Sequence, residues 1–139
     1  KKSNNINDLD AHIWDKWADE SGSIGKAYGY QLGIKHAYRE GMFDQVDRVI
    51  FDLKNNPNSR RIMTNIYNHA DLSEMHLYPC AYSMTFNVAN GKLSAILNQR
   101  SQLPRELTEV SIRNLAVELL INHYISTCTR TTVTVSLLS

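Results

Sequence analysis

Alternating hydrophobic and polar positions give this chain its clearest predicted element, a β-hairpin that follows Cys80. Larger apolar residues alternate with smaller or polar ones on both arms of the hairpin, at Tyr82, Met84, Phe86, Val88, Leu93, Ala95 and Leu97. The pair Asn90-Gly91 lies between the arms, and this dipeptide is the commonest signal for a tight hairpin turn. The pattern therefore predicts two antiparallel strands with one face turned to a core.

Helical spacing of apolar residues predicts three amphipathic helices. The first covers residues 6–20 and places Leu9, Ile13, Trp14 and Trp17 on one side. The second covers residues 43–55, where Phe43, Val46, Val49, Ile50 and Leu53 share a face and Pro57 prevents continuation. Beyond Pro104, a third pattern suggests a helix to about Tyr124.

Two further strands and a glycine-rich stretch complete the pattern. Residues 61–67 predict a short strand with Ile62, Thr64 and Ile66 on one face, and the alternation of Val133, Val135 and Leu137 predicts a final strand. Five of the six glycines fall between residues 21 and 41, which predicts loops there, with room for a binding loop. Because helices and strands are mixed without a strict βαβ rhythm, we expect an α/β or α+β layered sheet packed by helices.

Composition narrows the classes of function. The length of 139 residues fits one domain or part of one. A net charge of +1 without blocks of like charge gives no support for a nucleic-acid partner. The apolar runs are far too short for a membrane helix, and the start of the chain does not read as a signal peptide. Two cysteines without CxxC spacing fit a reducing compartment, so we expect a cytoplasmic protein with no membrane partner.

Cys80 is the first candidate for chemistry. It follows Pro79 at the start of the predicted hairpin, where a proline-fixed turn can hold a thiol at a constant angle to a cleft. Most lone cysteines are small buried hydrophobes, and a nucleophilic cysteine needs positive charge nearby. Arg60, Arg61 and Arg100 can supply that charge or bind a phosphate, although each taken alone is more often a solvated surface arginine.

Aromatic and imidazole side chains give weaker signals. Trp14 and Trp17 lie on one face of the first predicted helix, where a pair of this kind is usually core and less often a platform for a flat ligand. The five histidines show no metal-ligand spacing, so we predict no metal site.

These features occur together in an order that resembles the thymidylate synthase family over residues 5–102. The matching strings are His12-Ile13-Trp14-Asp15-Lys16-Trp17-Ala18-Asp19, Ala27-Tyr28-Gly29-Tyr30-Gln31-Leu32-Gly33, Asp44-Gln45-Val46-Asp47, Asn56-Pro57-Asn58-Ser59-Arg60-Arg61, Leu77-Tyr78-Pro79-Cys80, and Gly91-Lys92-Leu93 through Gln99-Arg100-Ser101. The resemblance implies one partial synthase-like domain over residues 1–139, family-like to residue 102 and diverged over 103–139.

The resemblance also implies roles for individual residues. Cys80 would attack the pyrimidine ring of dUMP, and the resulting enolate would take a one-carbon unit from methylenetetrahydrofolate, the co-substrate. Tyr28 matches an active-site tyrosine. Gln99, Arg100 and Ser101 match the phosphate-binding segment of the same subunit, whereas Arg60 and Arg61 match a pair that binds the phosphate held by a neighbouring subunit, which implies a homodimer. Ile13, Trp14 and Trp17 match positions that line the folate pocket.

Departures from the family pattern keep three functions open. Leu103 stands where the family has a folate-contacting aspartate, and Ser111 falls where an asparagine holds the pyrimidine. The chain is therefore expected to be a thymidylate synthase that converts dUMP to dTMP, or a truncated and inactive relative that binds nucleotide or pairs with a synthase subunit. The third function is that of a pyrimidine nucleotide hydroxymethylase, which shares the cysteine and the arginines.

Overall fold

The computed structural model describes residues 2–8, 12–90, 92–100 and 135–138. The chain forms two compact units, one made of Lys1–Gln45 and Asn65–Pro79 and the other of Val46–Thr64 and Cys80–Ser139. The predicted helix between Pro104 and Tyr124 lies outside the described residues. So does Val133, the first residue of the predicted final strand.

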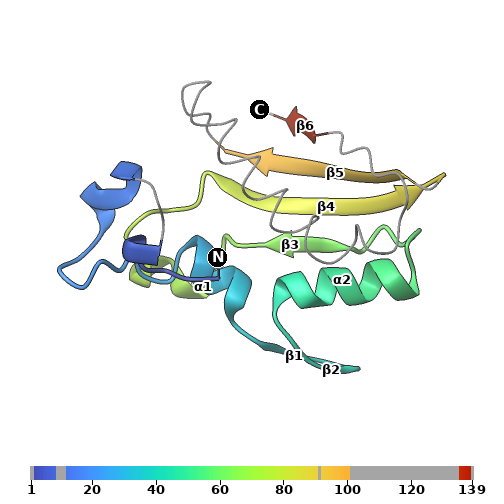
Figure 1. Cartoon of the computed structure of the whole chain (residues 1–139), viewed down its shortest axis with the longest axis horizontal. Coiled ribbons are helices and arrows are strands. Elements are labelled where there is room, and N and C mark those ends of the chain that lie inside the picture. Colours follow the sequence, from blue (N-terminus) through green and yellow to red (C-terminus); the bar gives the residue numbers. More distant parts are fainter. Residues whose placement is uncertain (1, 9–11, 91, 101–134, 139) are drawn as a thin grey trace. The chain divides into compact units, whose positions relative to one another are not determined.

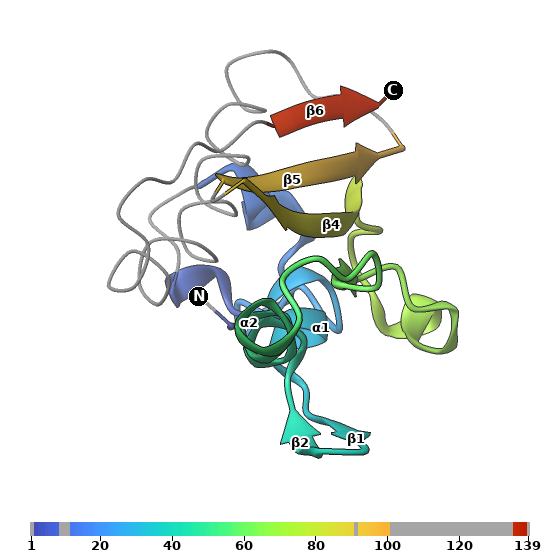
Figure 2. The same ribbon diagram turned by 90° about the vertical axis from the view of Figure 1, so that its right-hand side faces the viewer.

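The second unit is built around a four-stranded sheet. Its strands are β3 (Met63–Asn65), β4 (Ala81–Ala89), β5 (Lys92–Gln99) and β6 (Val135–Leu138), in that spatial order. β4 and β5 are antiparallel, and β6 runs parallel to β5 with Ala95 opposite Val135. Figure 1 shows these strands side by side, and Figure 2 shows helix α2 (Gln45–Asn55) almost end-on below β4 and β5. The predicted hairpin and the final strand are confirmed in the described residues, and so is the layered α/β architecture.

The core of this unit lies between the sheet and α2. Its buried side chains are Val49, Leu53, Ile62, Met84, Phe86, Leu93, Ala95 and Leu97. Met84 faces Leu97 and Phe86 faces Ala95 across the two strands, so the period-two pattern places one apolar face against the helix. Asn90 adopts a left-handed φ of 53° at the turn, as expected for an Asn-Gly hairpin.

The first unit consists of short elements. It contains the 3₁₀ helices η1 (Ile6–Asp8), η2 (His12–Trp17) and η3 (His69–Glu74), the helix α1 (Tyr28–Gly33), and a hairpin of β1 (His36–Tyr38) and β2 (Gly41–Phe43). Figure 1 shows β1 and β2 side by side, and they pair antiparallel with His36 opposite Phe43.

The prediction of one amphipathic helix over residues 6–20 is wrong, because the segment forms η1 and η2 instead. Both ends of the segment bond to the following loop: the N–H of Ile6 donates to the carbonyl of Gly22, and the N–H of Asp19 donates to the carbonyl of Ser23. The N–H of Asn7 also donates to the side chain of Asn5. Local side-chain acceptors and pairing with residues 22–24 outcompete a continuous helix.

The prediction that the glycines of residues 21–41 punctuate only loops is also wrong. Gly29 and Gly33 lie inside α1. A Cβ on Gly29 would collide with the backbone of Ser3, so this glycine permits close approach of two chain segments and does not end a helix. Gly22 and Gly25 do lie in loops, with φ values of 82° and 74°.

The predictions for residues 43–55 and 61–67 are confirmed with small shifts. The helix begins at Gln45, and the regular strand is limited to Met63–Asn65. Ile62, Thr64 and Ile66 are buried while Met63 and Asn65 are exposed, so the two predicted faces are present.

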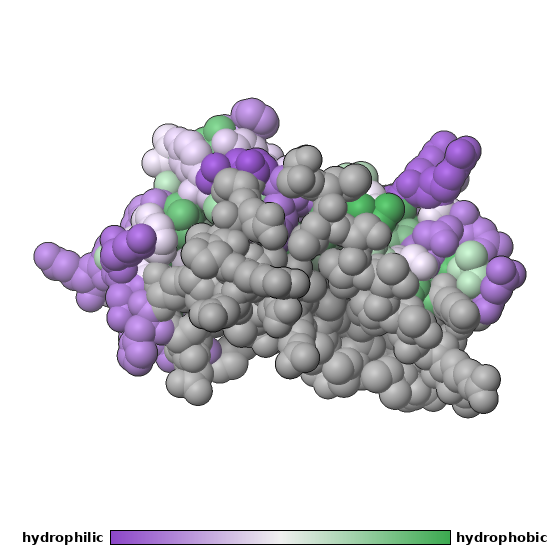
Figure 3. Space-filling model, turned by 90° about the horizontal axis from the view of Figure 1, so that it is seen from above, coloured by the Kyte–Doolittle hydropathy of each residue, from purple (hydrophilic) through white to green (hydrophobic). Residues whose placement is uncertain are grey.

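Hydrophilic residues predominate among those coloured in the space-filling view of Figure 3.

Candidate functional site

Cys80 and Arg100 lie on adjacent backbones at the open end of the hairpin. Cys80 precedes β4 and Arg100 follows β5, and the backbone N–H of Arg100 donates a 2.9 Å hydrogen bond to the carbonyl oxygen of Cys80. Ala81 pairs with Gln99 next to them. The Cys80 side chain is half-buried and the Arg100 side chain is exposed. The register of the hairpin therefore places Cys80 and Arg100 next to each other at its open end, where β4 begins and β5 ends.

A side-chain hydrogen bond lies close to this open end of the hairpin. The amide Nδ2 of Asn98 donates to the hydroxyl of Ser83 at 2.9 Å, beside a register shift between Ala81 and Ser83. Gln99 is the last residue of β5 and is half-buried. Ser101, the other residue of the predicted phosphate segment, lies outside the described residues.

Arg60 and Arg61 occupy the turn between α2 and β3, and both are exposed. The turn is shaped by Ser59, whose hydroxyl accepts a hydrogen bond from the backbone N–H of Arg61 at 3.2 Å. A serine that bonds its own backbone two residues on is a common way of tightening a turn. The two guanidinium groups are thus carried outward by a structured turn.

The aromatic candidates of the first unit come together. The rings of Trp14 and Trp17 have centroids 6.0 Å apart, and Trp14 lies 5.9 Å from Tyr28 at an interplanar angle of 52°. Lys16 places its ammonium nitrogen 4.0 Å from the centre of the Trp17 ring, within the range of a cation–π contact. The side chain of Ile13 lies outside the described residues. The structure thus joins two predicted folate positions to the predicted active-site tyrosine.

A polar network centred on Asp71 joins η3 to α1 and to Lys26, which precedes α1. Gln31, which is only 1% exposed, donates to the Asp71 carboxylate at 2.8 Å, and Asn68 donates to the same oxygen at 2.8 Å. Lys26 lies 3.3 Å from Asp71 and 2.8 Å from Glu74. The hydrogen bond from Gln31, followed by that from Lys26, lowers the pKa of Asp71. The hydrogen bonds to Glu74 and then to Asp71 raise the pKa of Lys26.

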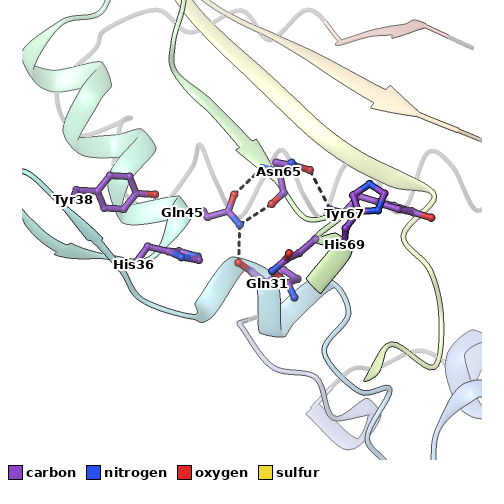
Figure 4. Close-up of a pocket in the computed structure, with 8 residues that line it drawn as sticks. Gln31, His36, Tyr38, Gln45, Asn65, Tyr67 and His69 are labelled. Carbon is purple, nitrogen blue, oxygen red and sulfur yellow. Dashed lines mark hydrogen bonds between the residues drawn. The ribbon is translucent and has the colours of Figure 1, made fainter. Parts of the chain in front are cut away.

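A cavity of about 550 Å³ lies wholly within the first unit. Its lining consists of two histidines, two tyrosines and four carboxamides: Gln31, His36, Tyr38, Gln45, Asn65, Tyr67, Asn68 and His69. Figure 4 shows His36 and Tyr38 on one side, Tyr67 and His69 on the other, and Gln45 bonded to Gln31 and Asn65 between them.

The candidate residues chosen from the sequence do not include this cavity lining. The repeated spacing of an imidazole and a phenol two residues apart, at His36 and Tyr38 and again at Tyr67 and His69, is the signal that could have indicated it. In an extended chain, residues two apart lie on the same side.

Two kinds of feature are absent from the described residues. No helix there is long and apolar enough to cross a membrane. Within the same ranges, no group of three or more His, Cys, Asp or Glu side chains is arranged to hold a metal ion.

Comparison with known proteins gives one consistent result. The family model described as thymidylate synthase matches residues 1–121. The chain is 48% identical over 104 residues to a thymidylate synthase of Bacillus subtilis subsp. natto. This match covers 72% of this chain and 37% of that protein. It is 47% identical over 104 residues to a thymidylate synthase of Bacillus atrophaeus, covering 72% of this chain and 46% of the relative.

A solved structure agrees with the sequence matches. The thermostable thymidylate synthase A from Bacillus subtilis superimposes with a TM-score of 0.76 and 40% sequence identity, over 85% of this chain and 45% of that one. The chain thus spans less than half the length of these relatives, and its sheet packed by helices is incomplete relative to their fold.

Proposed function

This chain belongs to the thymidylate synthase family, and on that premise we propose that it acts in the reductive methylation of dUMP to dTMP. The observation that carries the proposal is the position of Cys80 and Arg100 at the open end of the hairpin, where a backbone hydrogen bond of 2.9 Å joins the two residues. A thiol nucleophile for the ring and a guanidinium for the phosphate are two groups that a reaction on a pyrimidine nucleotide needs within one site.

Cys80 is the proposed nucleophile. Addition of its thiolate to the pyrimidine ring of dUMP moves electrons onto the ring carbonyl as an enolate, and ring carbon five then becomes nucleophilic. Gln99, Arg100 and Ser101 form the proposed binding segment for the nucleotide. Arg100 holds the phosphate so that the ring stays within reach of the sulfur, a gain of orientation that lowers the barrier. Tyr28 is the proposed active-site tyrosine.

Methylenetetrahydrofolate is the proposed co-substrate, which supplies the one-carbon unit and the reducing equivalent. The proposed folate-binding residues are Ile13, Trp14 and Trp17. The partly buried rings of Trp14 and Trp17 support this role, because tilted indoles with exposed area offer a surface for a flat heterocycle.

The proposed assembly is a homodimer in which Arg60 and Arg61 bind the phosphate of the nucleotide held by the partner. Their exposure on a structured turn supports an action outside their own subunit. As part of the same proposal, residues 1–139 form a single partial synthase domain, with residues 103–139 diverged from the family.

Trapping of a covalent complex tests the proposal. The folded chain is incubated with fluoro-dUMP and methylenetetrahydrofolate, and its intact mass is measured. We expect an adduct that is lost in Cys80→Ser and kept in Cys128→Ser, the matched control at the second cysteine. A folded chain without the adduct, or an adduct that survives Cys80→Ser, contradicts the proposal.

Release of tritium from ring carbon five distinguishes the methylation of dUMP from the hydroxymethylation of a cytosine nucleotide. The chain is given labelled dUMP and labelled dCMP in separate reactions. We expect release from dUMP; release from dCMP alone would instead favour the hydroxymethylase.

A further inference from the structure

Helix α1 begins with Tyr28, and its six residues are too few to fix its position by themselves. Isolated helices shorter than about 12 residues are marginal in water. Ala27, at the N-terminal cap of α1, makes no side-chain hydrogen bond that would anchor the helix start. Contacts with other segments must therefore decide where α1 lies.

Gln31 is the residue through which α1 is anchored. It is only 1% exposed, and its Nε2 donates to the carboxylate of Asp71 at 2.8 Å and to the carbonyl of Lys26 at 3.0 Å. Its backbone carbonyl accepts from the side chain of Gln45 at 2.8 Å. Because a buried amide that loses its acceptor is costly, these bonds restrict the positions that α1 can take.

Asp71 is itself fixed from both carboxylate oxygens. The oxygen that accepts from Gln31 also accepts from Asn68 at 2.8 Å, and Asn68 caps η3 by accepting from the N–H of Ala70. The other oxygen lies 3.3 Å from the ammonium nitrogen of Lys26. The carboxylate therefore offers the Gln31 amide an acceptor in a defined place.

Tyr28 lies three residues before Gln31, and residues with this spacing are neighbours on a helix. The centroid of its ring lies 5.9 Å from that of Trp14. From these contacts we propose that Asp71 is a positioning residue, which acts through Gln31 to hold α1 and the ring of Tyr28 in place. The inference rests on the proposed function, because it takes Tyr28 as the active-site tyrosine.

The release of tritium from labelled dUMP measures the effect on turnover. Asp71→Ala removes the acceptor of Gln31 and should lower kcat by at least about tenfold, while KM for dUMP changes by less than about twofold. Asp71→Asn keeps an oxygen for Gln31 and should recover most of the rate. Glu74→Gln is the matched control and should keep kcat, because it removes the other carboxylate bonded to Lys26 and leaves the Gln31 bond intact.

A double-mutant cycle separates the positioning of Tyr28 from a general loss of structure. In a Tyr28→Phe background, Asp71→Ala should lower kcat by less than about twofold, because the hydroxyl that Asp71 helps to place is gone. An equal loss of kcat in both backgrounds overturns the inference.

The position of the Tyr28 ring can also be followed without turnover. Labelling with fluorotryptophan gives the two tryptophans separate fluorine resonances, and Trp17→Phe assigns that of Trp14. Tyr28→Leu removes the neighbouring ring and should shift the Trp14 resonance. Asp71→Ala should shift it in the same direction.

Gln31→Met breaks the same hydrogen bond from its other end and should shift the Trp14 resonance in the same way, whereas Glu74→Gln should not. Circular dichroism identifies the variants that fold. A folded Asp71→Ala or Gln31→Met with the Trp14 resonance of the unchanged chain overturns the inference. An unchanged chain that releases no tritium contradicts the proposed function instead, and the fluorine shift still tests whether Asp71 places Tyr28.

Discussion

Gln45 and Asn65 form a reciprocal pair in which one side chain bonds both backbone groups of the other residue. The Gln45 amide accepts from the backbone N–H of Asn65 at 2.7 Å and donates to the carbonyl of the same residue at 2.8 Å. Asn65 is the last residue of β3, which is the edge strand of its sheet. One glutamine therefore satisfies both backbone groups where the strand ends, and its Nε2 also reaches the carbonyl of Gln31.

Replacement of Gln45 should reveal the energy of this pair. Gln45→Glu puts an acceptor against two carbonyl oxygens and should lower the free energy of unfolding by about 1–3 kcal/mol in urea titrations. Gln45→Met keeps the length of the side chain without hydrogen-bonding groups and should lose a similar amount. If Gln45→Met unfolds at the same urea concentration as the unchanged chain, the pair contributes nothing to stability.

Arg100 is expected to dominate the affinity for the nucleotide phosphate. Its planar guanidinium can meet two phosphate oxygens at once, so Arg100→Ala should weaken dUMP binding by about tenfold or more in calorimetry. Arg100→Lys keeps the charge but loses the forked pair of donors, so its affinity for dUMP should lie between those of the unchanged chain and Arg100→Ala. Lys54→Ala removes an exposed positive charge from α2 and serves as the control. Equal affinities for Arg100→Ala and Lys54→Ala would exclude the phosphate role.

The hydrophobic pattern predicted the second unit well because its information is local. The alternation of Met84 and Phe86 and the helical spacing of Val49 and Leu53 record directly which side chains face the core. The parallel pairing of β6 with β5 was not predictable in the same way, since it joins residues about forty positions apart and depends on contacts that periodicity does not encode.

The first unit was predicted poorly because polar contacts decide its structure. The network of Gln31, Asn68 and Asp71 joins positions up to 40 residues apart, and no periodic signal marks them. The parts of the candidate site were also unequally predictable. The proximity of Cys80 and Arg100 follows from the hairpin register, whereas the cavity depends on how residues 31–45 meet residues 65–69. The roles of the individual site residues came from family resemblance and not from the pattern.

The two faces of β5 should respond differently to truncation. Leu97 is 2% exposed in the core, and its neighbour Ile96 is 41% exposed on the opposite face. Leu97→Ala should destabilise the chain by about 2–5 kcal/mol, because it leaves a cavity among packed side chains. Ile96→Ala removes about as much volume from a solvated position and should cost under about 1 kcal/mol. Urea unfolding of both variants at low protein concentration measures the difference. Equal losses in the free energy of unfolding would contradict the assignment of Leu97 to the core face and Ile96 to the solvent face of β5.

Asp71 should make the stability of the chain depend on pH in the acid range. Its ordinary pKa of 3.8 is lowered in the folded chain, first by the hydrogen bond from Gln31 and then by that from Lys26. A carboxyl with a lowered folded pKa stabilises the fold above its unfolded pKa, and this stabilisation is lost as the pH falls through the folded value. Asp71→Asn should therefore be less stable than the unchanged chain at pH 7, and the difference should shrink below about pH 4. Glu20→Gln, which removes an exposed carboxylate, is the control for the loss of one negative charge. Thermal unfolding from pH 7 to pH 2.5 measures both, and a constant gap between Asp71→Asn and the unchanged chain would show that the Asp71 network does not titrate with folding.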